Sequence, residues 1–187
     1  MPIVISLLRA INVGGHAVIK MEDLRALHES MKFEDVQTYI QSGNVVFRTD
    51  EKDMTKLAKR VQDAIAKRFK VTPGVMLRTI AEMREVVAKN PFAKRRDVEP
   101  NKLHVSFLDA KLTPGACEQL RALALVTEEI IPIGKELFVY CSNGMGKAKI
   151  PWTKVDRICT TQGTARNWNT VMKLLEMAEA IEKRNDP

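Results

Sequence analysis

Apolar and polar residues alternate along residues 1–79 in a pattern that predicts four strands and two helices. Short apolar or β-branched runs, typical of strands, lie at 3–9, 36–40, 45–49 and 75–79. Apolar residues at helical spacing predict helices over 21–31 and 54–69. Gln41-Ser42-Gly43-Asn44 predicts a hairpin turn, because Gly and Asn tolerate a positive φ. The order strand-helix-strand-strand-helix-strand is that of a ferredoxin-like sub-domain, which we expect over residues 1–79.

A similar pattern begins again after residues 80–101, which predict a helix and a linker. Thr79 and Glu82 form a capping-box pattern, and Asn90-Pro91 should end the helix that follows. Residues 91–100 carry the charge run Lys94-Arg95-Arg96 and are expected to be a solvated polar linker. Residues 102–187 predict, in order, a strand, a helix, a hairpin and two helices. We therefore expect an α+β fold of two ferredoxin-like sub-domains in tandem, the second ending in helices.

The composition is that of an ordinary globular protein, with 45% hydrophobic and 28% charged residues. The 30 Lys and Arg outnumber the 23 Asp and Glu, and the net charge of +7 favours a polyanion or a phosphorylated small molecule as partner. No apolar run reaches the roughly 18 residues of a membrane span, and no export signal is recognised. Three cysteines without paired spacing argue against a disulfide framework or a zinc site. We expect a cytoplasmic protein without metal or cofactor, and the pattern indicates no oligomeric state.

Four segments together resemble one bacterial family. In chain order they read LLRAINVGG at 7–15, TYIQSGNVVF at 38–47, NPF at 90–92 and TARNWNTV at 164–171. This combination resembles the DUF1697 family, an uncharacterised group of small cytoplasmic proteins built on ferredoxin-like halves. The resemblance implies a fold and no activity. The family usually has Gly where this chain has Ala10, and Ser where it has Ala148.

Polar residues of the first half form two candidate ligand-binding groups. The first group lies between the first strand and the first helix and comprises Arg9, Asn12, Gly14, Gly15 and Lys20. Glycine amides and a helix N-terminus can together bind an anion there, and Arg9 can add a guanidinium. The simpler interpretation is that the glycines only permit a turn. The second group is Ser42 and Asn44 on the hairpin, although a chain reversal alone also favours these residues.

The second half carries a Gly/Lys loop, residues 143–149, with Lys147 and Lys149 and further cations after it. Such a loop suits phosphate contacts that do not identify bases, although charged loops are often only solvated. Arg166 and Asn167 are expected at the start of the last helix, where Thr164 would be the cap. We consider that these two residues close over a site built from Arg9 and Asn12.

The leading hypothesis is non-catalytic binding of nucleic acid, with weak sequence selectivity, through the Gly/Lys loop and helix N-termini. We expect no stacking of RNA on the sheets, because aromatic residues make up only 5% of the chain and no alternating Phe/Tyr pair is recognised. The alternative is an enzyme or sensor that binds a small phosphorylated or carboxylated metabolite in a cleft between the two halves. The sequence shows no catalytic constellation and no metal-ligand spacing of its His, Cys or carboxylate residues.

Overall fold

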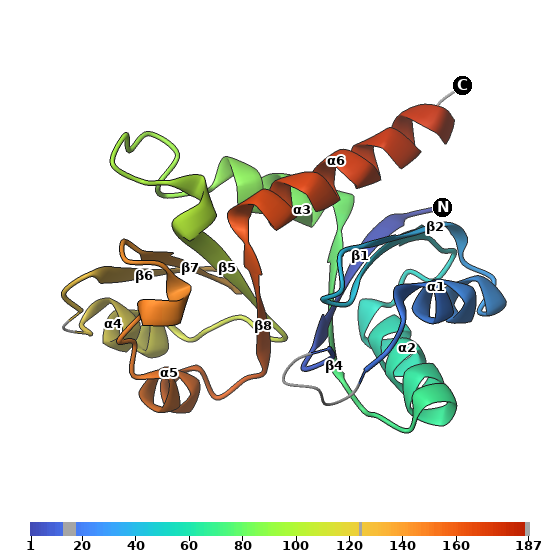
Figure 1. Ribbon diagram of the computed structural model, residues 1–187, viewed down its shortest axis with the longest axis horizontal. Helices are drawn as coiled ribbons and strands as arrows, with labels where there is room; N and C mark the ends of the chain where they lie inside the picture. The colour runs from blue at the N-terminus through green and yellow to red at the C-terminus, as the bar shows by residue number, and fades with distance from the viewer. Residues whose placement is uncertain (13–17, 124, 186–187) are drawn as a thin grey trace. The chain divides into compact units, whose positions relative to one another are not determined.

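The computed structural model has two four-stranded antiparallel sheets and, within the residues it describes, six α-helices, which confirms the α+β class (Figure 1). The described residues are 1–12, 18–123 and 125–185. They form two compact units. Unit 1 comprises Met1–Glu85 and Lys173–Pro187, and unit 2 comprises Val86–Met172. The division expected from the sequence instead assigned all of residues 102–187 to the second sub-domain.

Unit 1 contains one sheet with strand order β2-β3-β1-β4. Its elements are β1 (Ile3–Arg9), α1 (Met21–Ser30), β2 (Glu34–Tyr39), β3 (Asn44–Arg48), α2 (Met54–Phe69) and β4 (Gly74–Thr79). Alternate residues of the strands and the apolar faces of α1 and α2 form one core, which includes Val4, Phe47 and Leu57. Asp53 caps α2 by accepting a hydrogen bond from the Lys56 N–H at 3.0 Å.

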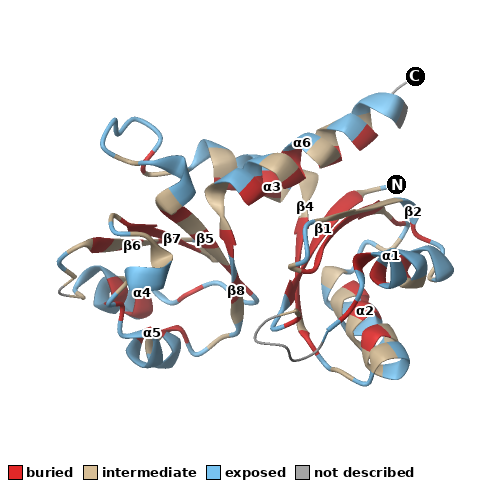
Figure 2. Ribbon diagram, in the orientation of Figure 1, coloured by how far each residue is buried: buried red, intermediate tan, exposed pale blue. Residues whose placement is uncertain are grey.

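Unit 2 repeats this order of elements, with the sheet order β6-β7-β5-β8. Its elements are β5 (Leu103–Leu108), α4 (Pro114–Arg121), β6 (Glu128–Ile133), β7 (Glu136–Cys141), α5 (Trp152–Cys159) and β8 (Gly163–Asn167). One face of its sheet packs with α4 and α5 around residues such as Leu120, Val139 and Val155. Figure 2 shows that α4 and α5 keep their outer faces exposed. Two further helices, α3 (Ile80–Ala88) and α6 (Trp168–Asn185), each contribute residues to both units.

Strand β8 corrects the sequence-based expectation for the second half. Thr164 was expected to cap the last helix, but it lies inside a strand that pairs with β5, and α6 begins at Trp168. The strand was missed because its buried residues, Thr164 and Arg166, are polar and give no apolar alternation. Both units therefore have the order β-α-β-β-α-β with antiparallel pairing, which is compatible with the expected ferredoxin-like arrangement.

Candidate functional site

The side chain of Asn12 joins two segments of unit 1 that are distant in sequence. Its Nδ2 donates to the carbonyl oxygens of Ile19 and Gln41, both at 2.9 Å, and its Oδ1 accepts from the Ile19 N–H at 2.7 Å. Asn12 has a φ of 54°, in the left-handed region that asparagine tolerates better than most residues. Asn12 therefore connects the segment after β1 to the turn between β2 and β3.

The hairpin residues have structural contacts within the same turn. Asn44 is fully buried and donates from Nδ2 to the Tyr39 carbonyl at 3.0 Å and to Ser42 Oγ at 2.9 Å. Gly43 has a φ of 71°, and a Cβ at that position would lie 2.6 Å from Ile11 Cδ1. Sequence reasoning thus selected residues that the fold does bring together, since Asn12 and Asn44 both hold this turn. The hydrogen bonds of Asn44 therefore stabilise the chain reversal itself.

The cations of the first group are exposed. Arg9 ends β1 and Lys20 precedes α1, and neither forms an ion pair with any residue that the structure describes. Gly14 and Gly15 lie outside the described residues, so the anion cradle expected there stays a prediction. Ala10 has a φ of 59°, a left-handed conformation that glycine adopts more readily. This accounts physically for the glycine that the resemblance implies at this position.

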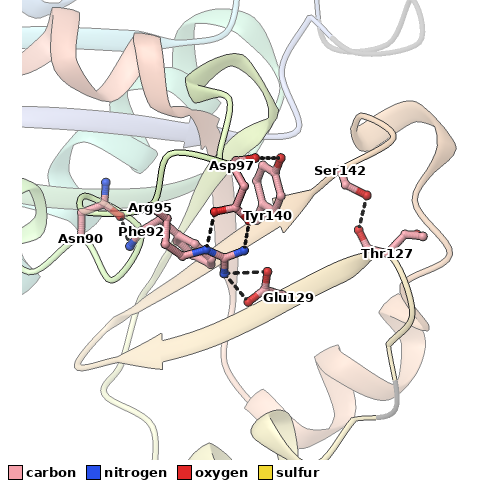
Figure 3. Close-up of polar contacts among 8 residues, drawn as sticks. All are labelled: Asn90, Phe92, Arg95, Asp97, Thr127, Glu129, Tyr140 and Ser142. Atoms are coloured by element: carbon pink, nitrogen blue, oxygen red, sulfur yellow. Dashed lines mark hydrogen bonds and ion pairs between the residues drawn. The ribbon is translucent and has the colours of Figure 1, made fainter.

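The Gly/Lys loop of unit 2 has a fixed backbone. The carboxylate of Glu128, a residue only 6% exposed, accepts a hydrogen bond from the Lys149 N–H at 2.9 Å, and this contact lowers the pKa of Glu128. At the start of the loop, Ser142 Oγ donates to the Thr127 carbonyl at 2.9 Å (Figure 3). Gly144 permits the reversal with a φ of 82°. The loop is therefore attached at both ends to the start of β6, through Thr127 and Glu128.

The side chains of this region carry positive charge to the surface. The exposed cations are Lys147, Lys149, Lys154 and Arg157. Within the described part of the chain none of these four makes an ion pair, whereas Arg95 and Lys102 of the same unit both have carboxylate partners. Helix α5 has no side-chain cap and no acidic residue in its first turn, and its first residue, Trp152, is 39% exposed. Positive charge is therefore exposed both on the loop and on α5.

Arg166 and Asn167 have partners inside unit 2. Arg166 is 7% exposed and donates from Nη1 to Thr164 Oγ1 at 2.7 Å and to the Ala165 carbonyl at 2.8 Å. Burial lowers the pKa of its guanidinium to about 10, so it stays charged at neutral pH. Asn167 donates to the Asn101 carbonyl at 2.7 Å, and its Oδ1 accepts from the Asn169 N–H at the start of α6. A site that combines these residues with Arg9 and Asn12 stays a prediction.

One aromatic pair was missed in the sequence. Phe138 and Tyr140 alternate on β7, so the expectation that no such pair exists was wrong. The strand register places them on the same sheet face as Phe107 of β5. All three are buried. The ring centroid of Phe92 lies 5.9 Å from that of Tyr140, and that of Trp168 lies 6.4 Å from that of Phe138. The pair could have been found from the letters FVY within the predicted strand.

The segment expected to be a solvated linker is attached to this face. We call residues 91–100 the strap. Arg95 in the strap forms ion pairs with Asp97, at 2.5 Å, and with Glu129 of β6, at 2.7 Å. The phenol of Tyr140 donates to the Asp97 carbonyl at 3.1 Å. Figure 3 shows the Arg95 side chain between these carboxylates, and Tyr140 beside Asp97.

Comparisons with known proteins agree with this architecture. Residues 1–138 match the family described as "Protein of unknown function (DUF1697)". The fold is similar to that of the conserved bacterial protein SP0830 from Streptococcus pneumoniae, with a TM-score of 0.68 and 21% sequence identity over 95% of this chain and 98% of that chain. This likeness shows the fold alone. No curated protein matches the sequence.

Metal ligation and membrane insertion find no support in the residues that the structure describes. No group of three or more His, Cys, Asp or Glu side chains among them is arranged to hold a metal ion. No described helix combines the length and apolar character needed to cross a membrane.

Proposed function

The chain belongs to the DUF1697 family, and we propose that it binds nucleic acid, with weak sequence selectivity, through the Gly/Lys loop and the start of α5. The observation that carries the proposal is the group Lys147, Lys149, Lys154 and Arg157, whose side chains are exposed and form no ion pair within the described residues. Because Glu128 fixes the loop backbone, little ordering is needed before the lysines meet phosphates. Contacts of this kind position a nucleic acid without identifying its bases.

The fold of the two units and the cellular location of the protein are part of the same proposal. We propose that units 1 and 2 are two ferredoxin-like halves. The repeated order of elements and the repeated strand order support this. The net charge of +7 supports long-range attraction of a polyanion. A cytoplasmic location, where nucleic acid is abundant, belongs to the same proposal.

The test is a titration of labelled oligo(U) RNA at several salt concentrations, followed by fluorescence anisotropy. Affinity should fall steeply between about 50 and 200 mM salt, because each phosphate contact releases counterions. The quadruple loop variant replaces Lys147, Lys149, Lys154 and Arg157 by alanine. It should bind more weakly, and the slope of log affinity against log salt should fall by about 0.7 for each phosphate that is no longer neutralised.

The matched control removes the same charge from exposed positions elsewhere, by alanine replacement of Lys52, Lys67, Lys111 and Lys183. If both quadruple variants lose affinity equally, net charge alone binds the RNA and the loop proposal fails. A flat titration of the unaltered protein at low salt also overturns it.

The alternative is that the ligand is a small phosphorylated or carboxylated metabolite. The same protein preparations distinguish it from nucleic-acid binding. Thermal unfolding is followed with pyrophosphate, nucleotides and sugar phosphates. A ligand present at a hundredfold excess over its Kd stabilises the folded state by about 2.7 kcal/mol, which is readily measured. Stabilisation by a small anion without any RNA binding would favour the alternative.

A further inference from the structure

We propose that the strap is a displaceable cover, and that single-stranded RNA stacks a base on Tyr140 once the strap has moved. This inference rests on the proposed function, because the Gly/Lys loop first attracts the phosphates. It adds a second binding surface in unit 2, together with a conformational step that controls access to it.

The first support is the concentration of aromatic side chains. Five of them gather on or against one sheet face of unit 2, in a chain with only two Trp, two Tyr and six Phe. They are Phe107, Phe138, Tyr140, Phe92 and Trp168. When the two sheets are compared by their strand registers, the position of Phe138 in unit 2 corresponds to that of Val46 in unit 1, and the position of Tyr140 corresponds to that of Arg48. An equivalent sheet thus folds without these rings. Aromatic side chains on neighbouring strands are a common platform for unpaired bases.

The second support is the way in which the strap is held. Its one buried anchor is Phe92, which is 2% exposed, whereas residues 93–97 are all exposed. The side chains of Arg95, Asp97 and Glu129 are 37%, 66% and 43% exposed. Ion pairs between such exposed groups stabilise little. A segment with few buried apolar contacts opens locally more easily than the sheet beneath it.

The third support is charge. Lys94 and Arg96 of the strap are exposed and make no ion pair with the described residues. When an RNA strand approaches, its phosphates can replace Asp97 and Glu129 as partners of Arg95. The same strand can then place a base against the uncovered Tyr140 ring. In the closed state, Glu129 and the Tyr140 phenol hold the strap in place, through Arg95 and the Asp97 carbonyl.

Two substitutions loosen the strap in different ways. Tyr140→Phe keeps the ring and the charge but removes the hydrogen bond to Asp97, and Glu129→Gln removes an ion pair with Arg95. If only the open form stacks a base, each should tighten oligo(U) binding by about three- to tenfold, as the open population rises. Glu118→Gln is the matched control, because it changes the same charge at an exposed position of α4. It should leave the stacking signal unchanged.

The readout that distinguishes stacking from general attraction is a 2-aminopurine base within the oligonucleotide. Its fluorescence should fall on binding, and fall further with Tyr140→Phe and Glu129→Gln. Adding Tyr140→Leu to Glu129→Gln should abolish the gain, with circular dichroism used to check folding. Hydrogen exchange of the Arg95 amide, which donates to the Phe92 carbonyl at 3.0 Å, should quicken in both loosened variants.

The outcomes separate the two proposals. If the quadruple loop variant loses RNA but neither loosened variant binds more tightly than Glu118→Gln, the strap inference is wrong and the proposed function stands. If Tyr140→Phe and Glu129→Gln gain binding while the quadruple loop variant behaves as the unaltered protein does, the proposed function is overturned, and only the stacking step of the strap inference stands, without attraction by the loop. If no variant binds RNA, both are overturned.

Discussion

Arg78 and Arg166 occupy the same position in the two sheets and make the same hydrogen bond. Arg78 on β4 lies opposite Ile5, and Arg166 on β8 lies opposite Val105. Each donates from Nη1 to the carbonyl of the residue before it, at 2.8 Å in both cases. Thr79 and Asn167, which follow them, each accept a backbone N–H from the first turn of the next helix. The repeat between the units therefore extends to individual side-chain contacts.

Truncating either arginine should destabilise the protein. Arg78→Ala and Arg166→Ala should each lower the free energy of unfolding by about 2–4 kcal/mol, because each leaves a cavity and unsatisfied polar groups. Methionine fills most of the space but removes the same hydrogen-bond donor, so the Met variants should lose less stability than the Ala variants, by about the cost of the avoided cavity. Urea unfolding gives these values. A Met variant as unstable as the Ala variant would show that the guanidinium itself is required.

Protonation of His28 should destabilise the protein in acid. His28 is buried between Phe33 and Phe47, and burial lowers its pKa from 6.5 to about 4. Between these two pH values the unfolded chain binds a proton that the folded chain does not. Stability is therefore complete above pH 6.5 and falls towards pH 4, by about 3 kcal/mol from this group.

The measurement compares urea unfolding of the unaltered protein and His28→Leu across that pH range. The variant should show a flatter dependence of unfolding free energy on pH. His104 also has a lowered pKa through burial and is present in both proteins, so it does not contribute to the difference. Parallel pH profiles would contradict the prediction.

Removing the Asn12 side chain should separate the segments that it joins. Asn12→Ala loses three hydrogen bonds to backbone groups and should lower the free energy of unfolding by about 2–3 kcal/mol. Asn12→Asp should cost at least as much, because a carboxylate oxygen then faces the carbonyls of Ile19 and Gln41. Asn143→Ala, at an exposed position, is the control and should change stability by less than about 0.5 kcal/mol.

Replacing Ala10 by glycine should stabilise the protein. The φ of 59° at Ala10 is unfavourable for an L side chain and not for glycine, so Ala10→Gly should gain about 0.5–1 kcal/mol. The same change at Ala66, inside α2, should lose about 1 kcal/mol. Thermal unfolding of the two variants gives opposite shifts if backbone conformation decides the outcome. If both glycine variants were destabilised, the prediction for Ala10 would be wrong.

Local patterns predicted most of unit 1, because its strands and helices have apolar residues at the spacing of each structure. They also identified the hairpin turn, where Asn44 now has visible partners. Strand β8 was missed because Arg166 is a buried cation, which no apolar pattern indicates. A comparison of Arg78-Thr79 with Arg166-Asn167, each directly before a helix, would have located it.

The strap shows a different limit of sequence reasoning. Lys94, Arg95 and Arg96 form a charge run, and such runs are usually solvated. Arg95 is instead paired with Glu129, which is 34 residues away in sequence. A partner so distant leaves no local signal. For the same reason the sequence does not reveal that Asn12 and Gln41 are connected.

Unit 1 is discontinuous, since Lys173–Pro187 belong to it with Met1–Glu85. Within it, Arg84 of α3 pairs with Glu179, at 3.1 Å, and with Glu182 of α6. Ribosomes release a chain from its N-terminus, and domains generally fold as they emerge. Because Met1–Glu85 is translated before Lys173–Pro187, Arg84 must wait for the later segment before its ion pairs with Glu179 and Glu182 can form. Unit 1 therefore cannot be completed before unit 2, which lies between its two segments in the sequence, has been synthesised.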